Sequence, residues 1–112
     1  IPSFLVQLFQ NLIGNGIKFR KENDRPIILI NAEERETEWL FTVEDNGIGM
    51  SAEIKEKIFT KFYRNEEQAS GQTTGLGLGL YYVRQIADAH GWDLTVNSKP
   101  GGGTTFIITI SN

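Results

Sequence analysis

The sequence contains no cysteine and only one histidine among its 112 residues. Without cysteine there is no disulfide framework, no thiol nucleophile and no cysteine-based metal site, and a single histidine cannot build a site that needs two. No apolar run approaches the roughly 20 residues of a membrane-spanning helix. Lysine and arginine number 11 against 14 aspartates and glutamates, a net charge of −3. This acidic balance argues against a nucleic-acid partner, because phosphate contacts need a basic surface.

Glycine is the residue type that the sequence has in excess. It occurs 12 times, somewhat above the average of about 7%. Hydrophobic residues make up 39% and charged residues 22%, the composition of a single globular domain over residues 1–112. Many of the glycines fall in short clusters at 47–49, 75–79 and 101–103, so these clusters are the first candidates for a ligand site.

The spacing of apolar residues predicts three helices and about four strands. The helices are expected at 1–20, 51–63 and 78–90, with Ser51 as the N-cap of the second and Gly91 ending the third. The strands are expected at 26–33, 38–44, 93–98 and 104–111, and a polar loop at 64–74. This order predicts an α+β domain, a two-layer α/β sandwich in which three helices cover one face of a mixed, mostly antiparallel sheet.

Two motifs combine polar side chains with positions where a ligand could bind. Asn11, Asn15 and Lys18 lie on one face of the first helix, where carboxamides and an ammonium suit a hydrated cation and phosphate oxygens. Asp45 precedes Gly47 and Gly49, so a carboxylate stands beside backbone that a flat ligand could approach. Each motif alone is explained as well by a solvated helix face or a tight turn.

Two further motifs are rich in glycine. The segment 75–79 opens the third helix, where free backbone N–H groups and the helix dipole favour an anion. Its spacing matches neither the dinucleotide-binding fingerprint nor a P-loop. The segment 101–106 is, by itself, a flexible hairpin turn.

Taken in order, the motifs N-x-x-x-N-x-x-K, D-x-G-x-G, F-x-x-F-Y-R, G-x-G-x-G and G-x-G-T-x-F resemble the five boxes of the sensor histidine kinase catalytic domain. That family belongs with the ATPases that include DNA gyrase, mismatch-repair ATPases and a heat-shock chaperone. The resemblance covers nearly the whole chain, and the first helix is similar to phytochrome-type kinases. It implies the Bergerat-type ATP-binding fold, with ATP and Mg²⁺ as cofactors.

The resemblance implies a role for each polar motif residue. Asn15 matches the Mg²⁺ ligand, and Asn11 and Lys18 match positions beside the phosphates. Phe19 matches an aromatic residue near the ribose. Asp45 matches the carboxylate that accepts a hydrogen bond from the adenine amino group and so separates ATP from GTP.

The remaining boxes would surround the nucleotide. The base would lie against the backbone at Gly47 and Gly49. The box that opens an ATP lid at 65–74 corresponds to Phe59, Phe62 and Arg64, of which Arg64 would meet phosphate. The loop on the phosphates corresponds to Gly75, Leu76, Gly77, Leu78 and Gly79. The strand behind the adenine begins with Thr104 and Thr105, either of which could bond to it through water.

The implied function is that of the ATP-binding catalytic domain of a two-component sensor histidine kinase. The γ-phosphate would pass to a histidine on a separate dimerisation domain and then to a response regulator receiver domain, with Asn11, Lys18 and Arg64 as the catalytic residues. Relatives that hydrolyse ATP carry a glutamate where this chain has Asn11, so slow or no intrinsic hydrolysis is expected. His90 does not match the phosphoacceptor.

Two alternatives stay open. One is a catalytically silent nucleotide-binding module that regulates a partner through its lid. The other is an anti-sigma-type serine protein kinase, which Asn11 disfavours. The resemblance also implies a monomeric fragment of a longer kinase, cytoplasmic, without the phosphoacceptor domain and a preceding strand. It leaves open whether the parent is soluble or membrane-anchored. Gly16, Leu76 and Trp92 depart from the usual alanine, threonine and glycine.

Overall fold

The computed structural model describes residues 3–59 and 79–111. In chain order the elements are α1 (Ser3–Lys18), β1 (Ile28–Glu34), β2 (Glu38–Asp45), α2 (Ala52–Lys57), α3 (Gly79–His90), β3 (Asp93–Ser98) and β4 (Thr104–Ser111). The strands form one sheet in the order β1-β2-β4-β3, and all three pairings are antiparallel. The predicted α+β class is confirmed, and among the described residues the sheet is wholly antiparallel.

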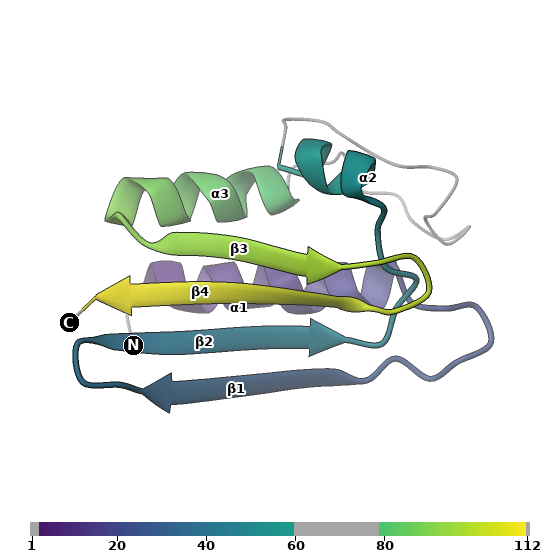
Figure 1. Ribbon diagram of the computed structural model, residues 1–112, viewed down its shortest axis with the longest axis horizontal. Coiled ribbons are helices and arrows are strands. Elements are labelled where there is room, and N and C mark those ends of the chain that lie inside the picture. Colours follow the sequence, from purple (N-terminus) through teal and green to yellow (C-terminus); the bar gives the residue numbers. More distant parts are fainter. Residues whose placement is uncertain (1–2, 60–78, 112) are drawn as a thin grey trace.

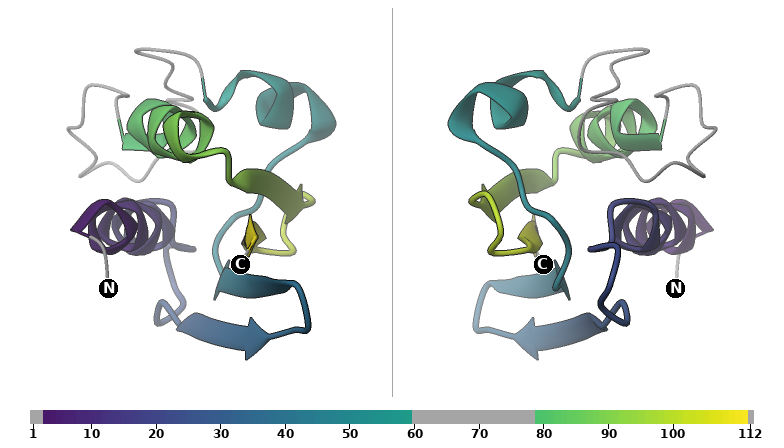
Figure 2. Two further views of the ribbon diagram at one scale, coloured as in Figure 1. Left: turned by 90° about the vertical axis from the view of Figure 1, so that its left-hand side faces the viewer. Right: turned by 90° about the vertical axis from the view of Figure 1, so that its right-hand side faces the viewer.

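The helices and the sheet form two layers (Figure 1). In the end-on views of Figure 2, α1 and α3 lie side by side against one face of the sheet, and α2 lies beyond the β3 edge. Two helices therefore cover the face for which three were expected. The third, α2, closes the edge of the same core, because Ile58 is buried in it and Ile54 packs against it.

Strand register assembles the core on the face that α1 and α3 cover. Val43 of β2 is paired with Phe106 of β4, which is paired in turn with Val96 of β3. From α1, Leu8 and Leu12 are four residues apart and pack onto this row with exposures of 0% and 1%. Each such apolar side chain contributes about 1.5–3 kcal/mol when fully buried. This packing holds α1 in place over the sheet.

Local signals fix the start of α2 and the end of α3 where they were predicted, whereas α1 ends at Lys18, two residues before its predicted end. Ser51 caps α2 through a hydrogen bond of 3.3 Å from the Ile54 N–H to its side-chain oxygen. Gly91 ends α3 with a φ of +70°, and the Trp92 N–H donates to the Ala87 carbonyl at 2.9 Å, as in a Schellman motif. However, α2 ends at Lys57, six residues before the predicted end at Tyr63, with Ile58 as its C-cap and the Ile58 side chain buried in the core.

The sheet has two edges, β1 and β3. Along β1, Leu29 and Ile30 are 57% and 52% exposed. An edge strand of this kind presents unpaired backbone groups, and the pairing of a further strand with it stays a prediction. Among the described residues, no helix has the length and hydrophobicity required to cross a bilayer.

Candidate functional site

The described motif residues gather at one end of the sandwich. The rings of Phe4, near the start of α1, and His90, at the end of α3, lie 5.2 Å apart, so the two helices run antiparallel. The start of α3 at Gly79 therefore faces the half of α1 that carries Asn15. At the same end β2 finishes with Asp45 and β4 begins with Thr104, the right-hand end of the sheet in Figure 1.

Asp45 is the central polar group of this end. It is half-buried and is paired with Thr104 across the sheet. Its Oδ1 accepts a hydrogen bond of 2.8 Å from the Gly47 N–H, and its carboxylate also accepts one from the Thr104 N–H. Burial raises the pKa of Asp45, and these two hydrogen bonds offset the rise only in part. Among the described residues, no lysine or arginine forms an ion pair with this carboxylate.

Helix α1 packs against Asp45 at Gly16. Gly16 is buried, and a Cβ built on it would lie 3.2 Å from the Asp45 Cβ, 3.4 Å from its Oδ2 and 2.5 Å from the Ile28 Cδ1. The terminal methyl of Ile28 therefore occupies the space that an alanine side chain would take. An alanine at position 16 would therefore require the Ile28 side chain to shift.

The loop after Asp45 is held by backbone contacts. The Ile48 N–H donates to the Phe19 carbonyl at 3.1 Å, and the Gly101 N–H donates to the Ile48 carbonyl at 2.7 Å. A Cβ at Gly47 would approach the Phe19 carbonyl oxygen to 2.6 Å, and a Cβ at Gly49, whose φ is +72°, would overlap the Lys99 carbonyl. Both glycines are thus required by the chain's own packing, and their predicted contact with a base stays a prediction.

The predicted cation and phosphate residues share α1 with Gly16. Asn11, Asn15 and Lys18 are all half-buried, and the Lys18 Nζ lies 5.6 Å from the centre of the Phe19 ring. The described residues contain no cluster of three or more carboxylate or histidine side chains able to hold a metal. Asn11 and Asn15 are the residues of α1 whose carboxamide oxygens could serve as ligands to a cation at this end.

The two threonines are placed differently. Thr104 is 6% exposed and lies on the covered face, directly opposite Asp45. Thr105 is half-buried and points to the opposite face, because successive side chains of a strand alternate. Of the two, Thr104 is the one that stands beside the carboxylate.

Other predicted residues contact the core or lie outside the described part. Phe59 packs edge-on against Phe106, with ring centres 6.3 Å apart, and the Arg84 guanidinium lies 4.6 Å from the centre of its ring. Gly79 is exposed at the first position of α3. The residues and range that lie outside the described residues are Phe62, Arg64, Gly75, Leu76, Gly77, Leu78 and the lid at 65–74.

Sequence reasoning missed two residues that organise this end. Asn46 joins the loop to the segment before β1, because its Oδ1 accepts from the Ile27 N–H at 2.8 Å and its Nδ2 donates to the Arg25 carbonyl at 3.0 Å. Its place between Asp45 and a glycine signalled only a turn. Ser98, the last residue of β3, bonds to three neighbours, and nothing in its sequence context signals this because the contacts depend on register.

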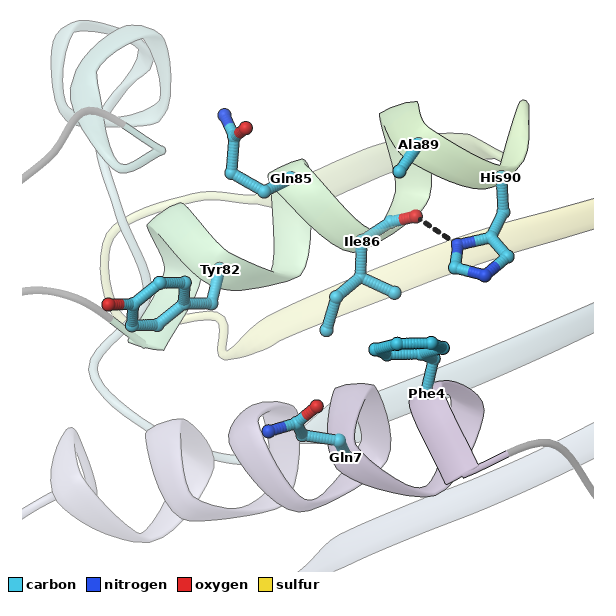
Figure 3. Close-up of a pocket in the computed structure, with 7 residues that line it drawn as sticks. All are labelled: Phe4, Gln7, Tyr82, Gln85, Ile86, Ala89 and His90. Atoms are coloured by element: carbon cyan, nitrogen blue, oxygen red, sulfur yellow. Dashed lines mark hydrogen bonds between the residues drawn. The ribbon is translucent and has the colours of Figure 1, made fainter.

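A separate hollow of about 330 Å³ lies between α1 and α3 (Figure 3). Its lining residues are Phe4, Gln7, Tyr82, Gln85, Ile86, Ala89 and His90. Phe4 precedes Asn15 by eleven residues on α1, which is about 16 Å at the rise of a helix. This hollow is therefore distinct from the end that carries Asp45.

His90 has a structural position, as its place at a helix end predicted. Its Nδ1 donates to the Ile86 carbonyl at 2.8 Å, as Figure 3 shows. The ring stacks on Trp92 at 4.6 Å and lies against Phe4. The rings of Phe4, His90 and Trp92 thus form an aromatic cluster at the far end of the two helices.

Comparison with known proteins identifies the family of the chain. The family model described as histidine kinase-, DNA gyrase B-, and HSP90-like ATPase matches residues 1–112. Cyanobacterial phytochrome A of a Nostoc species is 45% identical over 106 residues, which are 95% of this chain and 14% of that protein. The chain therefore spans only a small part of this curated relative.

Solved structures share the fold. The catalytic domain of histidine kinase ThkA aligns with a TM-score of 0.76 at 32% identity, covering 97% of this chain and 66% of the other. Full-length ShkA in complex with AMPPNP aligns with a TM-score of 0.79 at 27% identity, covering 96% of this chain and 21% of the other.

Proposed function

The chain belongs to the histidine kinase-, DNA gyrase B- and HSP90-like ATPase family, and from this membership we propose that it binds Mg²⁺-ATP and supplies the γ-phosphate to a protein histidine. The acceptor would lie on a dimerisation domain of the parent protein, which would pass the phosphate to a response regulator receiver domain. The ATP analogue in the ShkA complex supports nucleotide binding in this family.

The observation that carries the proposal is the state of Asp45. Burial raises the pKa of this carboxyl, and among the described residues no cation compensates its charge. A half-buried carboxylate without a compensating cation lowers the stability of the fold, so its presence here favours a role in ligand binding. An exocyclic amino group is a fitting ligand, because it donates hydrogen bonds and a carboxylate only accepts them.

The other end of the nucleotide would meet α1. Mg²⁺ prefers oxygen ligands and keeps several waters, so one carboxamide, from Asn15, together with phosphate oxygens is a suitable set. Asn11 and Lys18, one turn before and after, would contact the phosphates. Bound Mg²⁺ would neutralise the negative charge that develops on the phosphates during transfer.

The same residues predict little hydrolysis by this domain alone. A water molecule that attacks the γ-phosphate needs a base or a positioning group. Asn11 carries a carboxamide, which does not accept a proton at neutral pH. We therefore propose that ATP persists in the site until a histidine is presented.

The first test is calorimetric titration of the domain with ATP and with GTP, each with and without Mg²⁺. We expect ATP to bind more tightly than GTP, and Mg²⁺ to strengthen that binding. Asp45→Asn should weaken ATP binding by about 1.5–3 kcal/mol, the range for a hydrogen bond to a charged group. Glu44→Gln is the matched control, because Glu44 is the exposed neighbour on the opposite face. Normal ATP binding by Asp45→Asn would show that Asp45 does not bind the base.

Transfer is tested by adding a histidine-bearing helical domain to the nucleotide-loaded protein. Acid-labile phosphate on that domain, followed by its passage to a receiver domain, is the expected result. Selective ATP binding without transfer to any such domain would instead favour the silent regulatory module. We also propose that the domain lies in the cytoplasm, whether the parent is soluble or membrane-anchored.

A further inference from the structure

Ser98 is the point at which three segments around Asp45 are joined. It ends β3, and its Oγ accepts a hydrogen bond of 2.8 Å from the N–H of Met50, which follows the loop after Asp45. The same Oγ donates to the Gly103 carbonyl at 2.8 Å. It also lies 2.9 Å from the hydroxyl oxygen of Thr104. The site residues inferred above do not include Ser98.

The hydrogen-bond count fixes the direction of the bond between the two hydroxyls. A serine hydroxyl has one proton and two lone pairs. The Ser98 proton goes to the Gly103 carbonyl, which can only accept, and one of its lone pairs takes the Met50 N–H. The bond to Thr104 is therefore donated by the Thr104 hydroxyl. With its only proton used in this way, Thr104 presents lone pairs alone to anything else that it meets.

This direction matters because of what stands next to Thr104. Strand register places Asp45 directly opposite, on the same covered face. A carboxylate accepts hydrogen bonds and does not donate them when it is ionised. Asp45 and Thr104 thus form a pair of neighbouring acceptors, which would favour a ligand or bridging water that donates and would disfavour a second acceptor.

We propose that Ser98 is a positioning residue for base recognition: it holds the Thr104 hydroxyl as an acceptor beside Asp45 and thereby favours a 6-amino purine over a 6-oxo purine. The inference rests on the proposed nucleotide function and adds a residue to it. Ser98 acts through Thr104 and does not itself touch the base.

ATP and ITP are the probes for this effect, because they differ only along one edge of the purine: adenine has a 6-amino donor and an N1 acceptor, whereas hypoxanthine has a 6-oxo acceptor and an N1–H donor. In Ser98→Ala the Thr104 hydroxyl loses its acceptor and is free to turn its proton toward the ligand. We expect the ratio of ATP to ITP affinity to fall by about three- to tenfold, the range for one neutral hydrogen bond. Ser98→Thr, which keeps the hydroxyl, should restore the ratio.

The dependence on Thr104 is tested with a double mutant. Thr104→Val removes the hydroxyl, so adding Ser98→Ala to it should leave the ratio unchanged. If Ser98→Ala does not fold, Ser98→Cys serves in its place, because a thiol fills the site but donates and accepts only weakly. Thermal melting of each variant measures its loss of stability, which the affinity ratio does not measure.

The outcomes separate the two proposals. A wild-type domain that binds ATP no better than ITP overturns the assignment of Asp45 and, with it, the role of Ser98. A wild-type domain that prefers ATP, with the same preference in Ser98→Ala or Ser98→Cys, overturns the role of Ser98 alone. An effect of Ser98→Ala that persists in the Thr104→Val background also overturns it, because Ser98 would then act by another route.

Discussion

Replacing Gly16 with alanine tests the packing of α1 over the candidate site. Alanine favours a helix interior by about 1 kcal/mol over glycine, so the substitution should stabilise α1 if nothing opposed it. The structure opposes it, because the new methyl would lie 2.5 Å from the Ile28 Cδ1 and 3.2 Å from the Asp45 Cβ. Overpacking of a core typically costs about 1–3 kcal/mol. The expected net change for Gly16→Ala is therefore between zero and a loss of about 2 kcal/mol.

The same helix supplies a matched control. A Cβ at Gly14 would meet nothing within 4 Å, so Gly14→Ala should show the propensity gain of about 1 kcal/mol undiminished. The free energy of unfolding is measured in urea, with circular dichroism and the fluorescence of Trp39 and Trp92 as probes. A gain for Gly16→Ala equal to that for Gly14→Ala would refute the close approach to Ile28.

Ile28→Val removes the methyl that occupies the space. Alone it should cost about 0.5–1.5 kcal/mol, as for other isoleucine-to-valine changes in partly buried sites. Combined with Gly16→Ala it should be nearly neutral, because the alanine methyl fills the space that the valine leaves. The two changes should thus couple by about 0.5–3.5 kcal/mol, and strictly additive energies would contradict the geometry. Since Asp45 adjoins both residues, ATP affinity of the double mutant shows whether the carboxylate has moved.

Three further predictions concern the same end of the molecule. Burial raises the pKa of Asp45, so the folded chain binds the carboxyl proton of Asp45 more tightly than the unfolded chain does. The resulting stabilisation is complete at acid pH and is lost as the pH rises through the folded pKa. The melting temperature of Asp45→Asn should therefore rise relative to that of wild type between acid and neutral pH. Gly49→Ala should destabilise the fold by at least about 1 kcal/mol more than Gly91→Ala, measured in urea, because both glycines have positive φ but only Gly49 has backbone in the way. Asn15→Ala should abolish the Mg²⁺ dependence of ATP binding in calorimetry, and unchanged dependence would show that Asn15 is not the cation ligand.

Most of the secondary structure follows from local pattern. The strands at 93–98 and 104–111 begin and end where alternation and turn residues indicated, and Ser51 and Gly91 cap their helices as local chemistry predicts. These signals involve only near neighbours in the chain, so they can be read without knowledge of the fold.

Elements whose limits depend on packing were harder to predict. The apolar residues after Lys57 are compatible with a longer helix, but α2 ends with Ile58 as its C-cap, and the Ile58 side chain is buried in the core. A helix of six residues has little stability of its own, so its end is set by what it packs against. For the same reason α2 lies at the β3 edge and not over the face of the sheet.

By itself the sequence determined the family, the order of elements and the identity of the candidate residues, because motif order and hydrophobic periodicity are properties of the chain alone. Only the tertiary structure decided how they act together. Register sets Thr104, and not Thr105, beside Asp45. Contacts across 48 residues of sequence make Ser98 the centre of a hydrogen-bond network. A residue's partners in space are fixed by strand pairing and helix packing, which no local pattern records.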